Sequence, residues 1–156
     1  MEKSSPDKDR HVLIAADKTE SSKRAVLYVA DFLGGVPGIS LTLLYIIPEP
    51  PEDYFASEAE RREWVEKDEE EARRMLENYA AILVQAGFPE EKVKTLVGPC
   101  DLPSIAECIL KSQEELDCCT IVVGRRGISK KEEFLFSSTS SRLLHAAKNC
   151  AVWVIE

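Results

Sequence analysis

The sequence has no apolar stretch long enough to cross a membrane, and it has a deficit of positive charge. Its 156 residues include 20 Lys and Arg against 28 Asp and Glu, which gives a net charge of −8. Proteins that bind nucleic acid usually carry a surplus of Lys and Arg to contact the phosphates. The N-terminal residues are also too polar for a signal peptide. We therefore expect a cytoplasmic protein whose partners are neither nucleic acid nor membrane.

The sequence also lacks cysteines at the spacings that are typical of metal sites or of disulfide frameworks. The five cysteines form no C-x-x-C pair, and with two histidines they offer no zinc spacing, so no metal site is expected. Cys100 and Cys108 fall on one expected helix, where eight residues span about 12 Å and prevent a disulfide. The adjacent Cys118 and Cys119 are either redox-active or small buried hydrophobic residues, and Cys150 is the fifth cysteine. An odd, unpatterned set of cysteines suits a reducing compartment.

The composition that is present, 44% hydrophobic and 31% charged residues, is that of a soluble globular protein. Residues 1–9 are expected to form a disordered tail and residues 10–156 a single domain. Short apolar runs predict strands, and apolar residues at helical spacing predict helices. The expected strands are His11–Ala16, Ser40–Ile47, Val93–Val97, Cys119–Val123 and Ala151–Ile155. The expected helices lie between Thr19 and Leu33, from about Ala56 to Ala86, at Leu102–Leu116 with Asp101 as the cap, and at Arg142–Lys148.

This alternation predicts an α/β fold, namely a doubly wound, five-stranded parallel sheet of flavodoxin-like order with helices on both faces. Ligands of such sheets bind beyond the carboxyl ends of the strands, where the strand order reverses. The first and fourth strands would flank that crevice and bring Asp17 close to Gly124. The acidic run Asp68–Glu71 on the long helix is interpreted as a solvated face.

The stretch Thr120–Ser141 is the most informative part of the chain. A buried strand ends at Gly124, Gly127 follows, and hydroxyl residues from Ser137 onward precede the last helix. Such a strand, glycine turn and helix N-terminus can bind a phosphate, although a plain turn before a capped helix would explain the same residues. The charged side chains of this loop would contact the anion or Mg²⁺, or would simply be solvated: Arg125, Arg126, Lys130, Lys131, Glu132 and Glu133.

These features resemble the universal stress protein family over roughly His11 to Ile155. The family signature G-x2-G-x9-G-[S/T] is matched by Gly124, Gly127 and Ser138. The chain departs from it at Ser137, where the ATP-binding branch of the family has its third glycine. Another branch lacks this glycine and does not bind ATP. The resemblance also implies a fold like that of the adenine nucleotide alpha-hydrolases.

The resemblance implies a stress-response protein that binds ATP, alone or with Mg²⁺, at the crevice between the first and fourth strands, without dedicated catalysis. The alternative is a member of the non-nucleotide-binding branch that acts through dimerisation and protein–protein contacts. The residues implied in nucleotide binding are Ala15, Asp17, Ile46, Val123, Gly124, Arg126, Gly127, Ser137, Ser138 and Thr139. Asp17 would accept hydrogen bonds from the ribose or adenine, unless it only caps the first helix, and the serines could likewise be helix caps.

A third hypothesis is an enzyme, either an ATPase or an adenylyl-transferring relative. The sequence has no Walker pattern G-x-x-x-x-G-K-[ST], and neither His11 nor His145 falls on the glycine loop. These residues therefore do not favour catalysis.

The last strand indicates how the chain assembles. An apolar terminal strand at the edge of a sheet is prone to pair with another chain unless something covers it. Universal stress proteins commonly pair through this strand, so the resemblance implies a homodimer with Val152, Trp153 and Val154 at the interface. Alternatively, Trp153 packs within the chain against the last helix.

Overall fold

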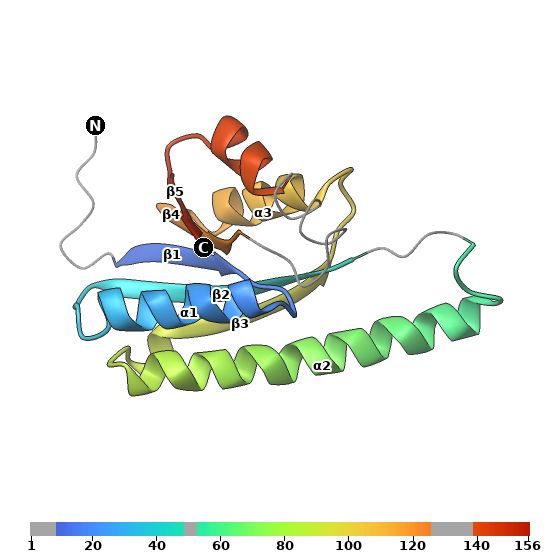
Figure 1. Ribbon diagram of the computed structural model, residues 1–156, viewed down its shortest axis with the longest axis horizontal. Coiled ribbons are helices and arrows are strands. Elements are labelled where there is room, and N and C mark those ends of the chain that lie inside the picture. Colours follow the sequence, from blue (N-terminus) through green and yellow to red (C-terminus); the bar gives the residue numbers. More distant parts are fainter. Residues whose placement is uncertain (1–8, 49–52, 126–138) are drawn as a thin grey trace.

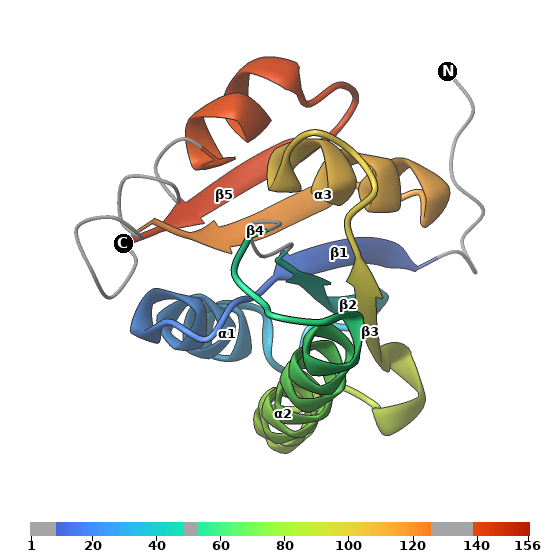
Figure 2. The same cartoon turned by 90° about the vertical axis from the view of Figure 1, so that its right-hand side faces the viewer.

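The computed structural model describes residues 9–48, 53–125 and 139–156, and it contains one sheet between two layers of helices (Figures 1 and 2). The strands are β1 (Arg10–Ala15), β2 (Ile39–Ile47), β3 (Val93–Pro99), β4 (Thr120–Gly124) and β5 (Ala151–Ile155). The helices are α1 (Glu20–Leu33), α2 (Glu58–Gln85), the 3₁₀ turn η1 (Glu90–Lys92) and α3 (Ile105–Glu115). Residues 139–146 are also helical.

All five strands are parallel, in the order β3-β2-β1-β4-β5. The predicted α/β class and five-stranded parallel sheet are confirmed, and the first strand lies beside the fourth as expected. The flavodoxin order is not the one found, because in that order the third strand separates the first from the fourth. Here the chain adds β2 and β3 outward on one side of β1. It then returns through α3 to place β4 and β5 on the other side.

Both faces of the sheet are buried. Successive side chains of its central strand, β1, point to opposite faces and so enter two separate cores. Ile14 points into a core formed with α1 and α2, where it packs with Val26 and Leu76. Leu13 points into the core of the other face, where it packs with Ile109 of α3 and Leu143. Leu13 and Ile14 are both fully buried. Figure 2 shows α1 and α2 together on one side of the sheet and α3 on the other.

Helix α3 begins three residues later than the sequence predicts. Its N-cap is Ser104, whose hydroxyl oxygen accepts a hydrogen bond from the Glu107 N–H at 3.2 Å, and not Asp101. The physical reason is Pro103, because a proline disfavours helical backbone angles at the residue before it, here Leu102. The last helix also differs from its prediction: residues 139–146 are helical, whereas the sequence predicts a helix at Arg142–Lys148.

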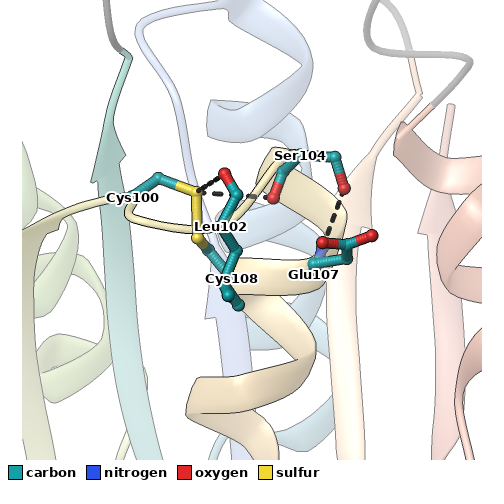
Figure 3. The surroundings of a disulfide bond; sticks show 5 residues. All are labelled: Cys100, Leu102, Ser104, Glu107 and Cys108. Atoms are coloured by element: carbon teal, nitrogen blue, oxygen red, sulfur yellow. Dashed lines mark hydrogen bonds between the residues drawn. A yellow bond between two sulfur atoms is a disulfide. The ribbon is translucent and has the colours of Figure 1, made fainter.

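The structure also overturns the prediction that Cys100 and Cys108 cannot bridge. Cys100 lies outside the helix, directly after β3, and the connection turns back so that the two Cα atoms are 5.8 Å apart. The two residues form a disulfide (Figure 3). Cys118, Cys119 and Cys150 are free thiols.

Candidate functional site

The carboxyl ends of β1 and β4 lie side by side and carry several of the predicted site residues. Ala15 and Val123 are register partners across the two strands. Both belong to the core that α3 covers, and Ile46 of the neighbouring β2 packs against the same cluster. Val123 and Ala15 are buried and Ile46 is half-buried. The structure therefore brings three of the residues that the resemblance implies in nucleotide binding onto one face of the sheet, where the family resemblance would place the adenine.

Asp17 follows β1 and organises the start of α1. Its Oδ1 atom accepts hydrogen bonds from the Thr19 N–H at 2.9 Å, from the Ser22 hydroxyl at 2.8 Å and from the Thr19 hydroxyl. Thr19 is the N-cap residue but makes no side-chain capping bond itself, so the Asp17 carboxylate supplies the acceptor near the helix N-terminus. Within the described parts of the chain, no hydrogen bond reaches the second oxygen, Oδ2. One oxygen of Asp17 serves the fold and the other is available to a ligand.

Gly124 ends β4 against the first turn of α1. A Cβ atom built on Gly124 would lie 2.6 Å from both the carbonyl carbon and the carbonyl oxygen of Ser21. Ser21 and Ser22 are themselves buried, so this backbone cannot easily move away. The first glycine of the signature is thus required for packing of the strand end against the helix, whatever else it contacts.

The remaining predicted site residues are only partly described. Arg126, Gly127, Ser137 and Ser138 lie outside the described residues, as do the charged side chains predicted at 130–133. Thr139 is the first described residue of the last helix and is half-buried. Arg125 forms an ion pair with Glu156 at 3.1 Å on the surface, and its N–H donates to the Ile155 carbonyl oxygen at 2.8 Å.

A buried charge network beside the site was missed by the sequence analysis. Asp68 of α2, interpreted there as part of a solvated face, is only 8% exposed. Its Oδ1 atom is 2.5 Å from the Lys18 Nζ atom, and its Oδ2 atom accepts a hydrogen bond from the Tyr45 hydroxyl at 2.9 Å. Lys18 also pairs with Glu71 at 2.9 Å. Because Lys18 directly follows Asp17, the network ties the loop after β1 to both β2 and the long helix.

The network shifts the pKa values of three of its side chains, Tyr45, Lys18 and Glu71. Burial, the nearby Asp68 charge and the hydrogen bond to it raise the pKa of the Tyr45 phenol well above its ordinary range. Burial alone would lower the pKa of Lys18, but hydrogen bonds to Asp68 and Glu71 outweigh burial and raise it. The Lys18 hydrogen bond in turn lowers the pKa of Glu71.

The position of Asp68 was detectable from helical spacing. It lies four residues before Ala72 and so continues the buried stripe of α2 toward the N-terminus. The other members of that stripe are Ala72, Leu76, Tyr79 and Leu83. By contrast, Glu69 and Glu70 are solvated as expected and pair with Arg73 and Arg74 one turn later. A carboxylate in a buried stripe requires partners on other elements, and Lys18 and Tyr45 provide them.

The last strand lies at an edge of the sheet, as the predicted dimer requires. The Ala151 N–H donates to Cys119 on the β4 side, and the Ile155 carbonyl accepts from Arg125 on the same side. Because this pattern alternates, the backbone groups of Val152 and Val154 face away from β4. Trp153 packs within the chain, not against the last helix but against two aromatic rings of α1, with ring centroids 6.4 Å from Tyr28 and 6.0 Å from Phe32.

Over residues 9–48, 53–125 and 139–156, no cluster of three or more His, Cys, Asp or Glu side chains is placed to hold a metal ion. The helices of the same ranges include none with the length and apolar character that a membrane crossing needs.

Comparison with known proteins identifies related folds. The model of the universal stress protein family matches residues 9–156. No curated protein matches the sequence.

Several solved structures are similar to the chain. The universal stress protein UspA from Lactobacillus plantarum has 17% sequence identity and a TM-score of 0.73, with 96% of this chain and 99% of that chain covered. A universal stress protein from Archaeoglobus fulgidus in complex with dAMP has 17% identity and a TM-score of 0.64, with 94% and 98% covered. A universal stress protein in complex with cAMP has 16% identity and a TM-score of 0.67, with 94% and 97% covered.

The packing of Gly124 leads to a testable prediction about stability. Replacing Gly124 with Ala should lower the free energy of unfolding by about 2 kcal/mol, because the new methyl group would overlap the Ser21 backbone. Gly98→Ala is the matched control, since nothing lies within 4 Å of a Cβ at that position. Urea unfolding of both variants measures the difference. Equal stability of the two variants would contradict the packing role.

The Asp68 network leads to a second prediction. Tyr45→Phe should lower the free energy of unfolding by about 1–3 kcal/mol, because it removes the hydrogen bond to a buried carboxylate. Tyr28→Phe is the control, because Tyr28 is exposed and the change keeps its ring. A phenol whose pKa is raised by folding stabilises the protein fully below its ordinary pKa of 10.0 and loses this contribution as the pH rises above that value. Urea unfolding between neutral pH and pH ~11 should therefore show a steeper alkaline loss in the wild type than in Tyr45→Phe.

Proposed function

Because this chain belongs to the universal stress protein family, we propose that it binds an adenine nucleotide at the carboxyl ends of β1 and β4. The nucleotide we propose is ATP, alone or with Mg²⁺, held without dedicated catalysis. The observation that carries the proposal is the Asp17 carboxylate, which lies two residues after β1, at the edge of the sheet where Ala15 pairs with Val123. Its Oδ1 atom is saturated by α1, and its Oδ2 atom is left to accept a hydrogen bond from a ribose hydroxyl or an adenine amino group.

The surroundings of Asp17 fit a nucleotide in two further respects. Ala15, Ile46 and Val123 belong to one apolar cluster next to this edge of the sheet, and a flat base would be placed against it. The first turn of α1 and the end of β4 meet at this edge of the sheet, where ligands of parallel sheets bind. Two structural neighbours are complexes with adenine nucleotides, cAMP and dAMP, and their likeness to this chain lies in the fold.

The alternative function, that of a member of the non-nucleotide-binding branch, depends on Ser137. This residue occupies the position of the third signature glycine and lies outside the described residues. A serine there keeps the backbone N–H but adds a Cβ atom where the chain would pass a phosphate. If that atom blocks the site, the chain belongs to the non-nucleotide-binding branch and acts through its protein contacts.

A substitution at Asp17 tests the proposal with little effect on the fold. In Asp17→Asn the side-chain oxygen can still cap α1, while an N–H₂ donor replaces the available acceptor. Isothermal calorimetry against Mg-ATP, dAMP and cAMP should show binding to the wild type and roughly 10–100-fold weaker binding to the variant. Asp31→Asn is the control, because it makes the same charge change at an exposed position of α1.

A Ser137→Gly variant distinguishes the two branches in the same experiment. Binding by the wild type shows that the serine is tolerated. Binding by Ser137→Gly alone would place the protein in the non-nucleotide-binding branch. If neither protein binds any of the three nucleotides, the proposed site is wrong.

We also propose that the chain forms a homodimer through the outer edge of β5. Among the described residues no strand pairs with this edge, and the backbone groups of Val152 and Val154 face it. A second copy could pair there and satisfy these groups. The rings of Tyr28, Phe32 and Trp153 lie together on the side of α1, where Phe32 is 60% exposed, and they would extend the apolar surface beside the edge.

A proline in the edge strand tests the dimer. Val154→Pro removes an N–H that faces away from β4 and therefore leaves the bonds between β4 and β5 intact. Sedimentation velocity should find a dimeric wild type and a folded, monomeric variant. The control is Val154→Ala, which shortens the side chain but keeps the N–H and should remain dimeric. A monomeric wild type, or a folded Val154→Pro dimer, would overturn this proposal.

A further inference from the structure

We propose that Cys100 and Cys108 form a reversible thiol–disulfide exchange site, whose co-reactant is a small thiol and its disulfide. The site lies at the connection between β3 and α3 (Figure 3). Cys100 directly follows β3, and Cys108 is the fourth residue of α3. Their Cα atoms are 5.8 Å apart, within the range that a disulfide spans without backbone movement.

The two sulfur atoms differ in access, which defines the direction of exchange. Cys108 is 6% exposed, whereas Cys100 is half-exposed. The Sγ atom of Cys100 lies 3.5 Å from the Leu102 carbonyl oxygen and 3.4 Å from that of Ser104, at the open side of the turn. An external thiolate therefore reaches Cys100 first. Cys108 is then the leaving group, and its thiolate forms near the N-terminus of α3, where the helix dipole favours negative charge.

Two molecules of the same small thiol, RSH, act as the reductant, and each step of the exchange is balanced. An RS⁻ thiolate attacks the Cys100 sulfur, forms a mixed disulfide and breaks the Cys100–Cys108 bond, and the Cys108 thiolate takes up a proton. A second RS⁻ attacks the mixed disulfide, which releases RSSR and leaves Cys100 as a thiol. Two electrons pass from two RSH to the protein disulfide, and the reverse sequence closes the bond again.

The remaining cysteines indicate that this bond is one that opens and closes. Cys119 is exposed yet free, and Cys150 is half-buried and free. A protein that stays in an oxidising compartment seldom has an exposed free thiol as well as a disulfide. Burial raises the pKa of Cys118 to about 12, which keeps this thiol protonated and unreactive. The Cys100–Cys108 pair is therefore distinct from the other cysteines in both geometry and access.

The bond holds the first turn of α3 against the end of β3. Residues 100–104 form no regular secondary structure, so the disulfide and the Ser104 cap define how the helix starts. Ala106, two residues before Cys108, packs in the same core as Ala15 and Val123. Opening of the bond loosens this core, so the reduced protein should bind the nucleotide more weakly. This consequence rests on the proposed function.

Counting thiols tests the exchange site directly. After removal of any added thiol, the full-length protein is unfolded without reductant in the presence of iodoacetamide, so that the buried Cys118 is also alkylated, and it is weighed by mass spectrometry. We expect three alkylated cysteines before reduction and all five after dithiothreitol is added to the folded protein. Glutathione disulfide should then restore the count of three. Cys150→Ser should still gain two thiols on reduction, whereas Cys108→Ser should gain none.

A structural measurement accompanies the count. Reduction should lower the Tm of the wild type and of Cys150→Ser by roughly 5–10 °C and leave that of Cys108→Ser unchanged. Hydrogen exchange should become faster at the amides of residues 105–108 and stay unchanged in β1. Five alkylated cysteines before reduction, or a bond that dithiothreitol opens only after unfolding, would overturn the proposal.

Calorimetry with Mg-ATP in both redox states separates this proposal from the proposed function. Weaker binding after reduction supports the coupling between the exchange site and the nucleotide site, and equal affinity in both states contradicts it. If neither state binds, the nucleotide proposal fails, while the thiol count still decides whether the exchange site exists.

Discussion

The pairing of β1 with β4 is the constraint on which the rest of this structure depends. It joins residues more than a hundred positions apart, so that Ala15 and Val123 are neighbours although β2, β3 and the helices lie between them in the sequence. The two strands are buried on both faces, and the end of β4 must pass close to the first turn of α1. That approach tolerates no Cβ at Gly124. The edge of the sheet where a ligand would bind is therefore set by the same contacts that close the core.

Buried charge extends this constraint to the long helix. Asp68 is held between Lys18 and Tyr45, so α2 is tied to the loop after β1 and to the middle of the sheet by directional contacts as well as by apolar packing. Removal of one partner would leave a buried carboxylate partly unsatisfied, which costs more than a lost surface pair. Because Lys18 follows Asp17, the same network restrains the backbone of the predicted ligand site. The acidic helix is thus part of the architecture around the site, and its outward carboxylates, such as Glu69 and Glu70, remain a separate, solvated set.

The strands, which depend on local sequence pattern, were predicted well. Features that depend on contacts between distant side chains were missed. Apolar runs located all five strands to within about two residues, because parallel strands buried on both faces read as continuous hydrophobic segments. The predicted start of α3 at Leu102 was wrong because Pro103 disfavours helical backbone angles there, and the disulfide was missed because Cys100 was treated as part of the same helix as Cys108. Asp68 was missed because the run of four acidic residues concealed its place in the buried stripe. Ala15, Ile46 and Val123 lie on one face of the sheet because distant strands pair, which local sequence pattern alone could not specify.

The glycine signature and Asp17 differ in what they say about function. Gly124 is explained by its contact with Ser21, so its presence would be required in a member of the fold that binds nothing. Asp17 is different, because the cap of α1 uses one carboxylate oxygen and Thr19, Ser21 and Ser22 offer that helix hydroxyls of their own. An asparagine or serine would cap the helix about as well. The second oxygen of Asp17 lies at the carboxyl edge of the sheet, and under the proposed function it would accept a hydrogen bond from the ligand. The evidence for nucleotide binding within the described chain therefore rests on Asp17 more than on the glycine that first draws attention to the loop.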